Sequence, residues 1–93
     1  LGPKGSAWLA AEGVLHLLID LPSVDPEEDG GALAAHTAFW GLPGNPRPAA
    51  TITELIFGPD PLADGRYLLN LQVAAIENDA SPSRPLLFKL KEL

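Results

Sequence analysis

The 93-residue sequence predicts a small mixed fold, α/β or α+β, and three observations support this prediction. Apolar runs of strand length alternate with alanine-rich segments of helical periodicity. Clusters of glycine, proline and asparagine separate these runs, as turns do. The hydrophobic fraction of 46% and the charged fraction of 19% are typical of a globular chain with a modest core. We therefore expect residues 1–93 to form a single segment.

A helix followed by a strand opens the chain. Residues 6–12 favour a helix, with Ser6 or Gly5 as its N-cap. Residues 14–21 are almost entirely apolar, which predicts a buried strand. Acids, prolines and a serine then interrupt the chain in residues 19–26. Polar clusters after such strands are where α/β proteins usually place their chemistry.

An acidic turn and a second helix follow. The acidic turn at residues 25–31 lacks the alternating ligands and the distal glutamate of a calcium loop, so it is expected to be a solvated loop. Asp29 is placed to cap the helix predicted for residues 32–41. In that helix His36 recurs with Phe39 and Trp40 at spacings of three and four, which predicts that the histidine shares the apolar face.

The remaining chain predicts a loop and three strands. Residues 42–50 hold three prolines and are expected to form an exposed loop. Strands are predicted at 51–57 and 66–77 from their apolar and β-branched residues, and at 86–93, where lysines suit a sheet edge. Glu54 interrupts the first of these with a carboxylate, which is costly in a buried strand unless it is paired or binds a metal. The alternative is that Glu54 faces outward.

Composition and charge exclude several classes of function. A net charge of −6 with only six Lys and Arg argues against nucleic acid and anionic membrane surfaces as partners. No apolar stretch approaches the roughly 20 residues of a membrane span, and no signal peptide is recognisable. The absence of cysteine excludes a disulfide framework and a Cys-ligated zinc site, and fits a cytoplasmic protein.

Four side chains near the predicted strand ends remain as candidates for chemistry: Asp20, Asp25, His36 and Glu54. Histidine with carboxylates is the donor set of zinc or manganese hydrolases, in which the metal lowers the pKa of water. From the residues alone, His36 is better explained as a packed core histidine, and His16 as a packed or edge residue.

Six short motifs follow one another along nearly the whole chain: Gly13-Val14, Ile19-Asp20-Leu21-Pro22-Ser23-Val24-Asp25-Pro26, Ala35-His36, Glu54-Leu55, Gly65-Arg66-Tyr67 and Asp79-x-Ser81-Pro82-x-Arg84. This succession resembles the C-terminal half of the metal-dependent cyclase family, which includes bacterial kynurenine formamidase and isatin hydrolase. The motif at residues 19–26 is the most specific. The resemblance implies a swivelling β/β/α fold and a protein that usually dimerises.

The resemblance also implies roles for two residues. In the family, the histidine after the Asp-Pro loop and the glutamate on the next strand reach the active-site metal, and the matching positions are His36 and Glu54. The implied activity is hydrolysis of an amide, aryl formamide or related cyclic C–N bond in a small molecule by metal-activated water, with Zn or Mn as cofactor. His36 and Glu54 would serve as metal ligands or acid/base groups.

The family's main metal motif, His-x-Gly-Thr-His-x-Asp, belongs to its N-terminal half and does not occur in this sequence. We therefore expect the chain to be the C-terminal part of a cyclase-like domain. It would form a homo-oligomer or associate with an N-terminal half. The alternative is a non-catalytic truncated family member that serves as a dimerisation or protein-binding module.

Overall fold

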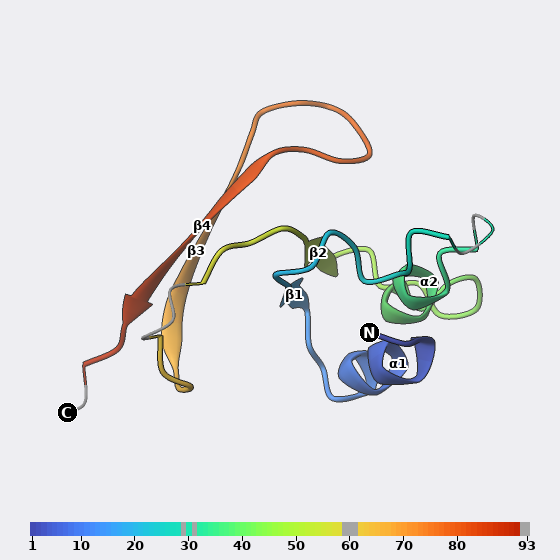
Figure 1. The fold of residues 1–93 in the computed structure, drawn as a ribbon, viewed down its shortest axis with the longest axis horizontal. Coiled ribbons are helices and arrows are strands. Elements are labelled where there is room, and N and C mark those ends of the chain that lie inside the picture. Colours follow the sequence, from blue (N-terminus) through green and yellow to red (C-terminus); the bar gives the residue numbers. More distant parts are fainter. Residues whose placement is uncertain (29, 31, 59–61, 92–93) are drawn as a thin grey trace. The chain divides into compact units, whose positions relative to one another are not determined.

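The computed structural model describes residues 1–28, 30, 32–58 and 62–91 (Figure 1). These residues form two compact units, Leu1–Phe57 and Gly58–Leu93. No helix in the described ranges has both the length and the apolar character that a membrane crossing requires.

Two helices and four strands make up the described structure. In chain order they are α1 (Pro3–Ala11), β1 (His16–Leu18), α2 (Ala34–Trp40), β2 (Thr51–Thr53), β3 (Tyr67–Val73) and β4 (Ser83–Lys89). β1 pairs with β2 in one sheet, and β3 pairs with β4 in another. The predicted small mixed α/β class is confirmed.

α1 confirms the first predicted helix but begins earlier. Its N-cap is Gly2 and its first residue is Pro3, so the prediction of a cap at Ser6 or Gly5 is wrong. Proline suits the first helical position because its φ is already helical and its missing N–H would be unpaired there anyway. After the helix, Gly13 takes a φ of +85°, a left-handed conformation that glycine adopts at low cost.

Replacing Ser6 with alanine is expected to raise the free energy of unfolding by about 1 kcal/mol. Ser6 is buried in α1, and its Oγ has no hydrogen-bond partner among the described residues. The hydroxyl therefore carries a desolvation cost without compensation, and alanine is the better helix former. Urea denaturation measures the change. Ser81→Ala is the control, because the Ser81 hydroxyl donates to a backbone carbonyl and is expected to give no gain. A loss of stability in Ser6→Ala would contradict the prediction.

β1 and β2 form a parallel pair in which His16 lies opposite Thr51. Parallel strands need a crossover connection, and the segment that contains α2 and residues 42–50 supplies it (Figure 1). Each strand has three residues, fewer than predicted for 14–21 and 51–57. The prediction of a buried strand is wrong, since the β1 residues are exposed or half-buried. In a described pair of two strands, both are edge strands.

α2 confirms the helix predicted at 32–41, with shorter bounds. It packs against α1. Its N-cap residue, Leu33, has a left-handed backbone and makes no side-chain capping bond, and the predicted cap Asp29 lies outside the described residues. The buried hydrophobic residues of the first unit are Val24, Ala35, Phe39 and Ala50. The core of this unit therefore lies around α2 and the loops on either side of it.

The second unit is an antiparallel pair in which Tyr67 lies opposite Lys89. β3 ends before the predicted limit of 66–77, and β4 begins earlier than the predicted 86–93. Half-buried and exposed side chains alternate along β3 as far as Leu71, which confirms the predicted alternation over that stretch. Among the described residues of this unit, no side chain is buried.

Candidate functional site

Asp25, His36 and Glu54 meet in the first unit although they come from three separate segments. Asp25 lies in the loop after β1, His36 in the first turn of α2, and Glu54 directly after β2. Because parallel strands run in the same direction, the segments that leave β1 and β2 emerge at the same end of the pair. Glu54 thus lies beyond the end of its strand, not inside it as predicted. Asp20, the fourth candidate, is exposed.

Asp25 is buried and accepts hydrogen bonds from the start of α2. The amides of Ala35 and His36 donate to its Oδ1 and Oδ2 at 2.7 and 3.0 Å. This carboxylate therefore caps the N-terminus of α2 in place of a side chain at the N-cap position. Burial raises the pKa of Asp25, but the hydrogen bonds from the Ala35 amide, the His36 amide and the His36 ring outweigh it. The pKa therefore lies below its ordinary value, and Asp25 is a carboxylate at neutral pH.

The orientation of the His36 ring is fixed on two sides. Its Nδ1 lies 2.7 Å from Asp25 Oδ2. Since an ionised carboxylate can only accept hydrogen bonds, Nδ1 carries the hydrogen and Nε2 faces away from Asp25. The Trp40 ring lies against the imidazole with a centroid distance of 5.3 Å. These contacts leave Nε2 as the reactive nitrogen.

Glu54 faces this nitrogen. Its Oε2 accepts the Val24 amide at 2.9 Å and lies 3.5 Å from His36 Nε2. That distance is long for a good hydrogen bond but close enough for an ion pair. At this separation, the imidazole nitrogen and the carboxylate oxygen can both contact one cation placed between them.

The donor pair His36–Glu54 has the chemistry that zinc and manganese sites use. Imidazole nitrogen and carboxylate oxygen are both common ligands, and two ligands of a tetrahedral zinc ion lie about 3.4 Å apart. Metal-bound histidines commonly donate their other N–H to a carboxylate, as His36 does to Asp25. Within the described ranges, however, no group of three or more His, Cys, Asp or Glu is arranged to hold a metal ion. The described residues thus fit part of a metal site.

Comparisons of the chain with protein-family models, with curated proteins and with solved structures find no match. The geometry of Asp25, His36 and Glu54 therefore carries the functional argument.

Sequence reasoning placed His36 and Glu54 as the candidate pair, and the structure brings them together. It named Asp25 among the four candidate side chains but missed that this carboxylate orients His36. No local signal points to that contact, which spans 11 positions. Trp40 was expected only on the apolar face of its helix. Its separation of four from His36, which makes two helical side chains neighbours, was the available signal.

Asp25 is expected to make the stability of the first unit depend on pH in the acid range. Its pKa is lowered from 3.8 in the folded state, so its contribution is fully present above the unfolded pKa. The contribution is lost as the pH falls through the lower folded pKa, because protonation then opposes folding. Urea denaturation from neutral pH to about pH 2 measures this dependence. An Asp25→Asn variant is expected to lose part of the acid slope, and an unchanged slope would contradict the assignment.

Proposed function

We propose that the protein is a metal-dependent hydrolase of the cyclase family in which His36 and Glu54 hold a Zn or Mn ion. The observation that carries this proposal is the pairing of His36 Nε2 with Glu54 Oε2 at 3.5 Å, with Asp25 behind the imidazole. The substrate would be a small molecule with an amide, aryl formamide or related cyclic C–N bond. A bound ion would supply an activated water for attack on the carbonyl carbon.

The residues around the pair prepare it for this chemistry. Asp25 holds the hydrogen on Nδ1 and thereby keeps Nε2 directed at Glu54. The Val24 amide fixes one carboxylate oxygen of Glu54. The other oxygen, Oε1, makes no hydrogen bond to any described residue, so it is available to accept a proton from water as a general base.

Further ligands would have to come from outside the described residues, because His36 and Glu54 provide only two. An N-terminal half with the family's metal motif, or a second copy of the chain, would supply them. This requirement makes association with another chain or segment part of the proposal.

Zinc binding by the purified protein tests the proposal. His36→Ala and Glu54→Ala are each expected to lower the amount of zinc retained after dialysis by at least about tenfold. His16→Ala is the matched control, since His16 is exposed and its ring hydrogen-bonds to the Thr51 hydroxyl, and this variant is expected to retain zinc. NMR of the imidazole nitrogens is expected to show a zinc-dependent shift at His36 Nε2. Equal zinc retention in all three variants would overturn the assignment.

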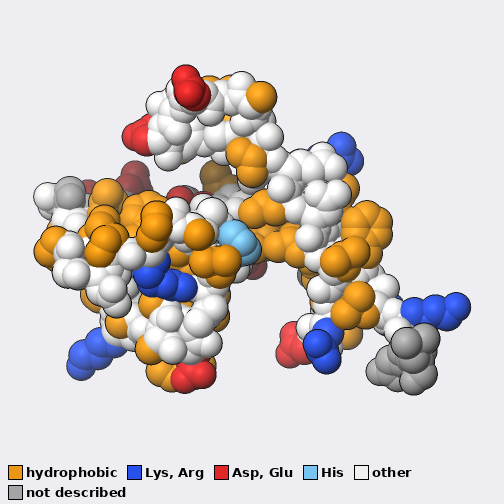
Figure 2. All heavy atoms as spheres, turned by 180° about the vertical axis from the view of Figure 1, so that it is seen from behind, with side chains coloured by type: hydrophobic (Ala, Val, Ile, Leu, Met, Phe, Trp, Pro, Cys, Tyr) orange, Lys and Arg blue, Asp and Glu red, His pale blue; other side chains and the backbone are white. Residues whose placement is uncertain are grey.

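The second unit favours the alternative function, a dimerisation module. Its large exposed hydrophobic side chains are Leu62, Leu68, Val73, Ile76, Leu87, Phe88 and Leu90. Figure 2 shows hydrophobic side chains exposed over much of the face in view. An isolated two-stranded pair without buried side chains is marginally stable in water, so a partner strand would stabilise it.

β3 is the edge that fits a second copy of the chain. β4 carries Arg84, Pro85 and Lys89, which discourage edge pairing, whereas β3 (Tyr67–Val73) carries no charge and no proline. Antiparallel pairing of two β3 strands around Asn70 would form a four-stranded sheet without opposing like charges. Such an isologous contact is the usual basis of a two-fold dimer.

Sedimentation of an Asn70→Lys variant tests this alternative. The substitution places two like charges opposite each other at the centre of the dimer, which disfavours pairing. Asn70 is exposed, so the hairpin itself is expected to persist. Asn78→Lys, in the loop after β3, is the matched control and is expected to remain dimeric. A monomeric unsubstituted protein, or equal dimerisation of both variants, would rule out pairing through β3.

A further inference from the structure

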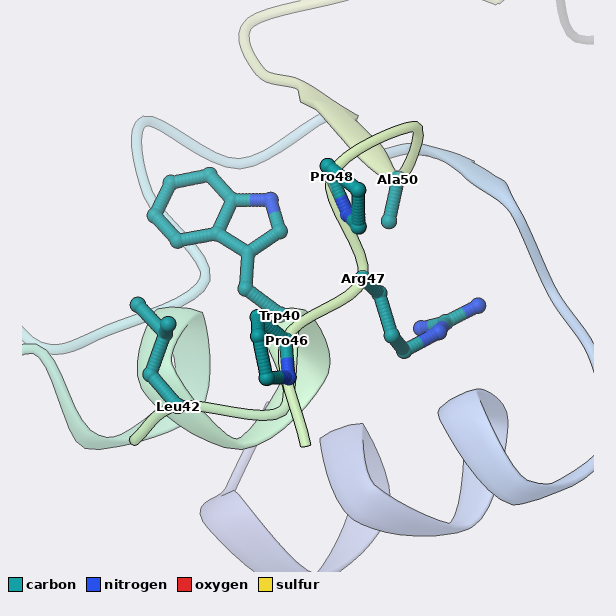
Figure 3. A pocket seen from close by; sticks show the side chains of 6 residues that line it. All are labelled: Trp40, Leu42, Pro46, Arg47, Pro48 and Ala50. Carbon is teal, nitrogen blue, oxygen red and sulfur yellow. The ribbon is translucent and has the colours of Figure 1, made fainter. Parts of the chain in front are cut away.

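A surface cavity of about 280 Å³, open to solvent, lies beside the C-terminal end of α2, within the first unit. Its lining residues are Trp40, Leu42, Pro46, Arg47, Pro48 and Ala50. Figure 3 shows the Trp40 indole standing beside Pro48, while the Arg47 side chain extends from the other side of the loop. The cavity therefore has an aromatic wall and an apolar wall of proline, leucine and alanine.

The loop that forms the cavity is held by its own backbone. Gly41 has a φ of +72°, and a Cβ there would lie 2.1 Å from the carbonyl oxygen of Asn45. The Asn45 amide donates to Gly41 O at 2.8 Å, and the Arg47 amide donates to Trp40 O at 2.9 Å. Only glycine permits this close approach. These bonds shape the loop against α2 without a ligand, which is typical of small-molecule sites.

The charge of Arg47 is used elsewhere. Its Nη1 donates to the Phe39 carbonyl at 2.7 Å, and its Nη2 donates to the Val14 carbonyl. The guanidinium carbon lies 4.9 Å from the centroid of the Phe39 ring. Arg47 thus ties the loop to α2 and to the start of the first sheet. Its guanidinium is occupied and does not make the cavity an anion site.

Trp40 contributes a polar group to the cavity wall, its indole N–H, which meets no acceptor among the described residues. A ligand that fits is therefore a flat ring with apolar faces, with an oxygen acceptor near the ring. The volume is below the range of drug-sized pockets and suits a single small aromatic group. Trp40 also lies against the His36 ring, so this one residue belongs to the cavity lining and contacts the candidate site.

We infer that this cavity binds the aromatic ring of a small-molecule ligand, with Trp40 as the stacking surface. Its role as the substrate's ring subsite rests on the proposed hydrolase function, whereas ring binding itself does not. Because residues 42–50 form most of the wall, this loop would determine which rings are accepted.

Tryptophan fluorescence tests the inference with formanilide, which carries a phenyl ring and a carbonyl oxygen. A Trp8→Phe variant leaves Trp40 as the only reporter, and Trp8 is exposed on α1, away from the cavity lining. We expect formanilide to change the Trp40 emission saturably. Formamide, which lacks the ring, is expected to cause no saturable change at the same concentrations. A Trp40→Phe variant, in which Trp8 reports, is expected to show no saturable change with formanilide.

Two variants of the wall sharpen the test. Ala50→Leu fills the cavity and is expected to raise the Kd for formanilide by about tenfold or more. Ala50 is buried, so this variant could also perturb folding. Leu42→Ala removes apolar contact at a half-exposed position, so we expect little effect on folding. It is expected to raise the Kd for formanilide several-fold. An unchanged Kd in Leu42→Ala, or equal responses of Trp8 and Trp40, would overturn the inference.

The outcomes separate this inference from the proposed function. A saturable Trp40 response that persists in Glu54→Ala, without zinc binding in any form of the protein, would support the ring site and refute the hydrolase. Zinc binding at His36 without a Trp40 response to formanilide would refute the ring site alone.

Discussion

Replacing Asp25 with alanine is expected to lower the free energy of unfolding of the first unit by about 3–5 kcal/mol. The carboxylate accepts the amides of Ala35 and His36 and the Nδ1–H of His36. Its removal leaves these donors without their partner at a buried position and takes away the cap of α2. For a small unit this loss approaches the whole stability, so a large unfolded population is expected.

Asp20→Ala is the control for this variant, because Asp20 lies in the same segment but is exposed. It is expected to change the free energy of unfolding by no more than about 0.5 kcal/mol. Urea denaturation followed by far-UV circular dichroism compares the two. Similar losses in both variants would show that the segment is sensitive to any substitution, and the specific role of Asp25 would then be refuted.

Replacing Phe39 with alanine is expected to cost about 3–5 kcal/mol. Phe39 is completely buried, and its ring also lies under the Arg47 guanidinium. The substitution would leave a cavity at the centre of the first unit and weaken the tie between α2 and the loop.

Phe57→Ala provides a matched comparison, since the substitution removes the same atoms from a residue that is 92% exposed. Its expected effect on the free energy of unfolding is no more than about 0.5 kcal/mol. Thermal and urea unfolding of the two variants measure the difference. If Phe57→Ala cost as much as Phe39→Ala, Phe57 would be packed in solution and the described core would be incomplete.

The parts of the fold that sequence predicted are those decided by local pattern. The helix at 32–41 and the proline-rich loop at 42–50 were found because side-chain periodicity and backbone restriction are local properties. The burial and length of the strand at 14–21 were predicted wrongly. An apolar run shows that its residues favour a buried strand, but it does not show whether other elements cover that strand. The helix cap was missed for a related reason, since Asp25 reaches α2 across an intervening loop.

The candidate site, like the fold, was predicted from the sequence only in part. Glu54 was predicted as a site residue because a carboxylate among apolar residues is costly unless it is paired. The structure places it against His36. The tautomer of His36, by contrast, depends on a buried carboxylate that no spacing rule reveals. Trp40 and the loop that follows it form a cavity through backbone hydrogen bonds within residues 40–47, and a count of prolines and glycines does not specify that geometry.

The parallel pairing of β1 and β2 has a consequence for the order of folding. The Asp25–His36 contact closes over 11 positions, whereas the Val24–Glu54 contact closes over 30. Closing the longer loop costs about 1 kcal/mol more in chain entropy. We therefore expect Asp25 to orient His36 early in folding and Glu54 to reach His36 late. Protection of the Val24 amide in pulsed hydrogen exchange would report the late step. The pair facing each other across 3.5 Å would then mark completion of the first unit's fold.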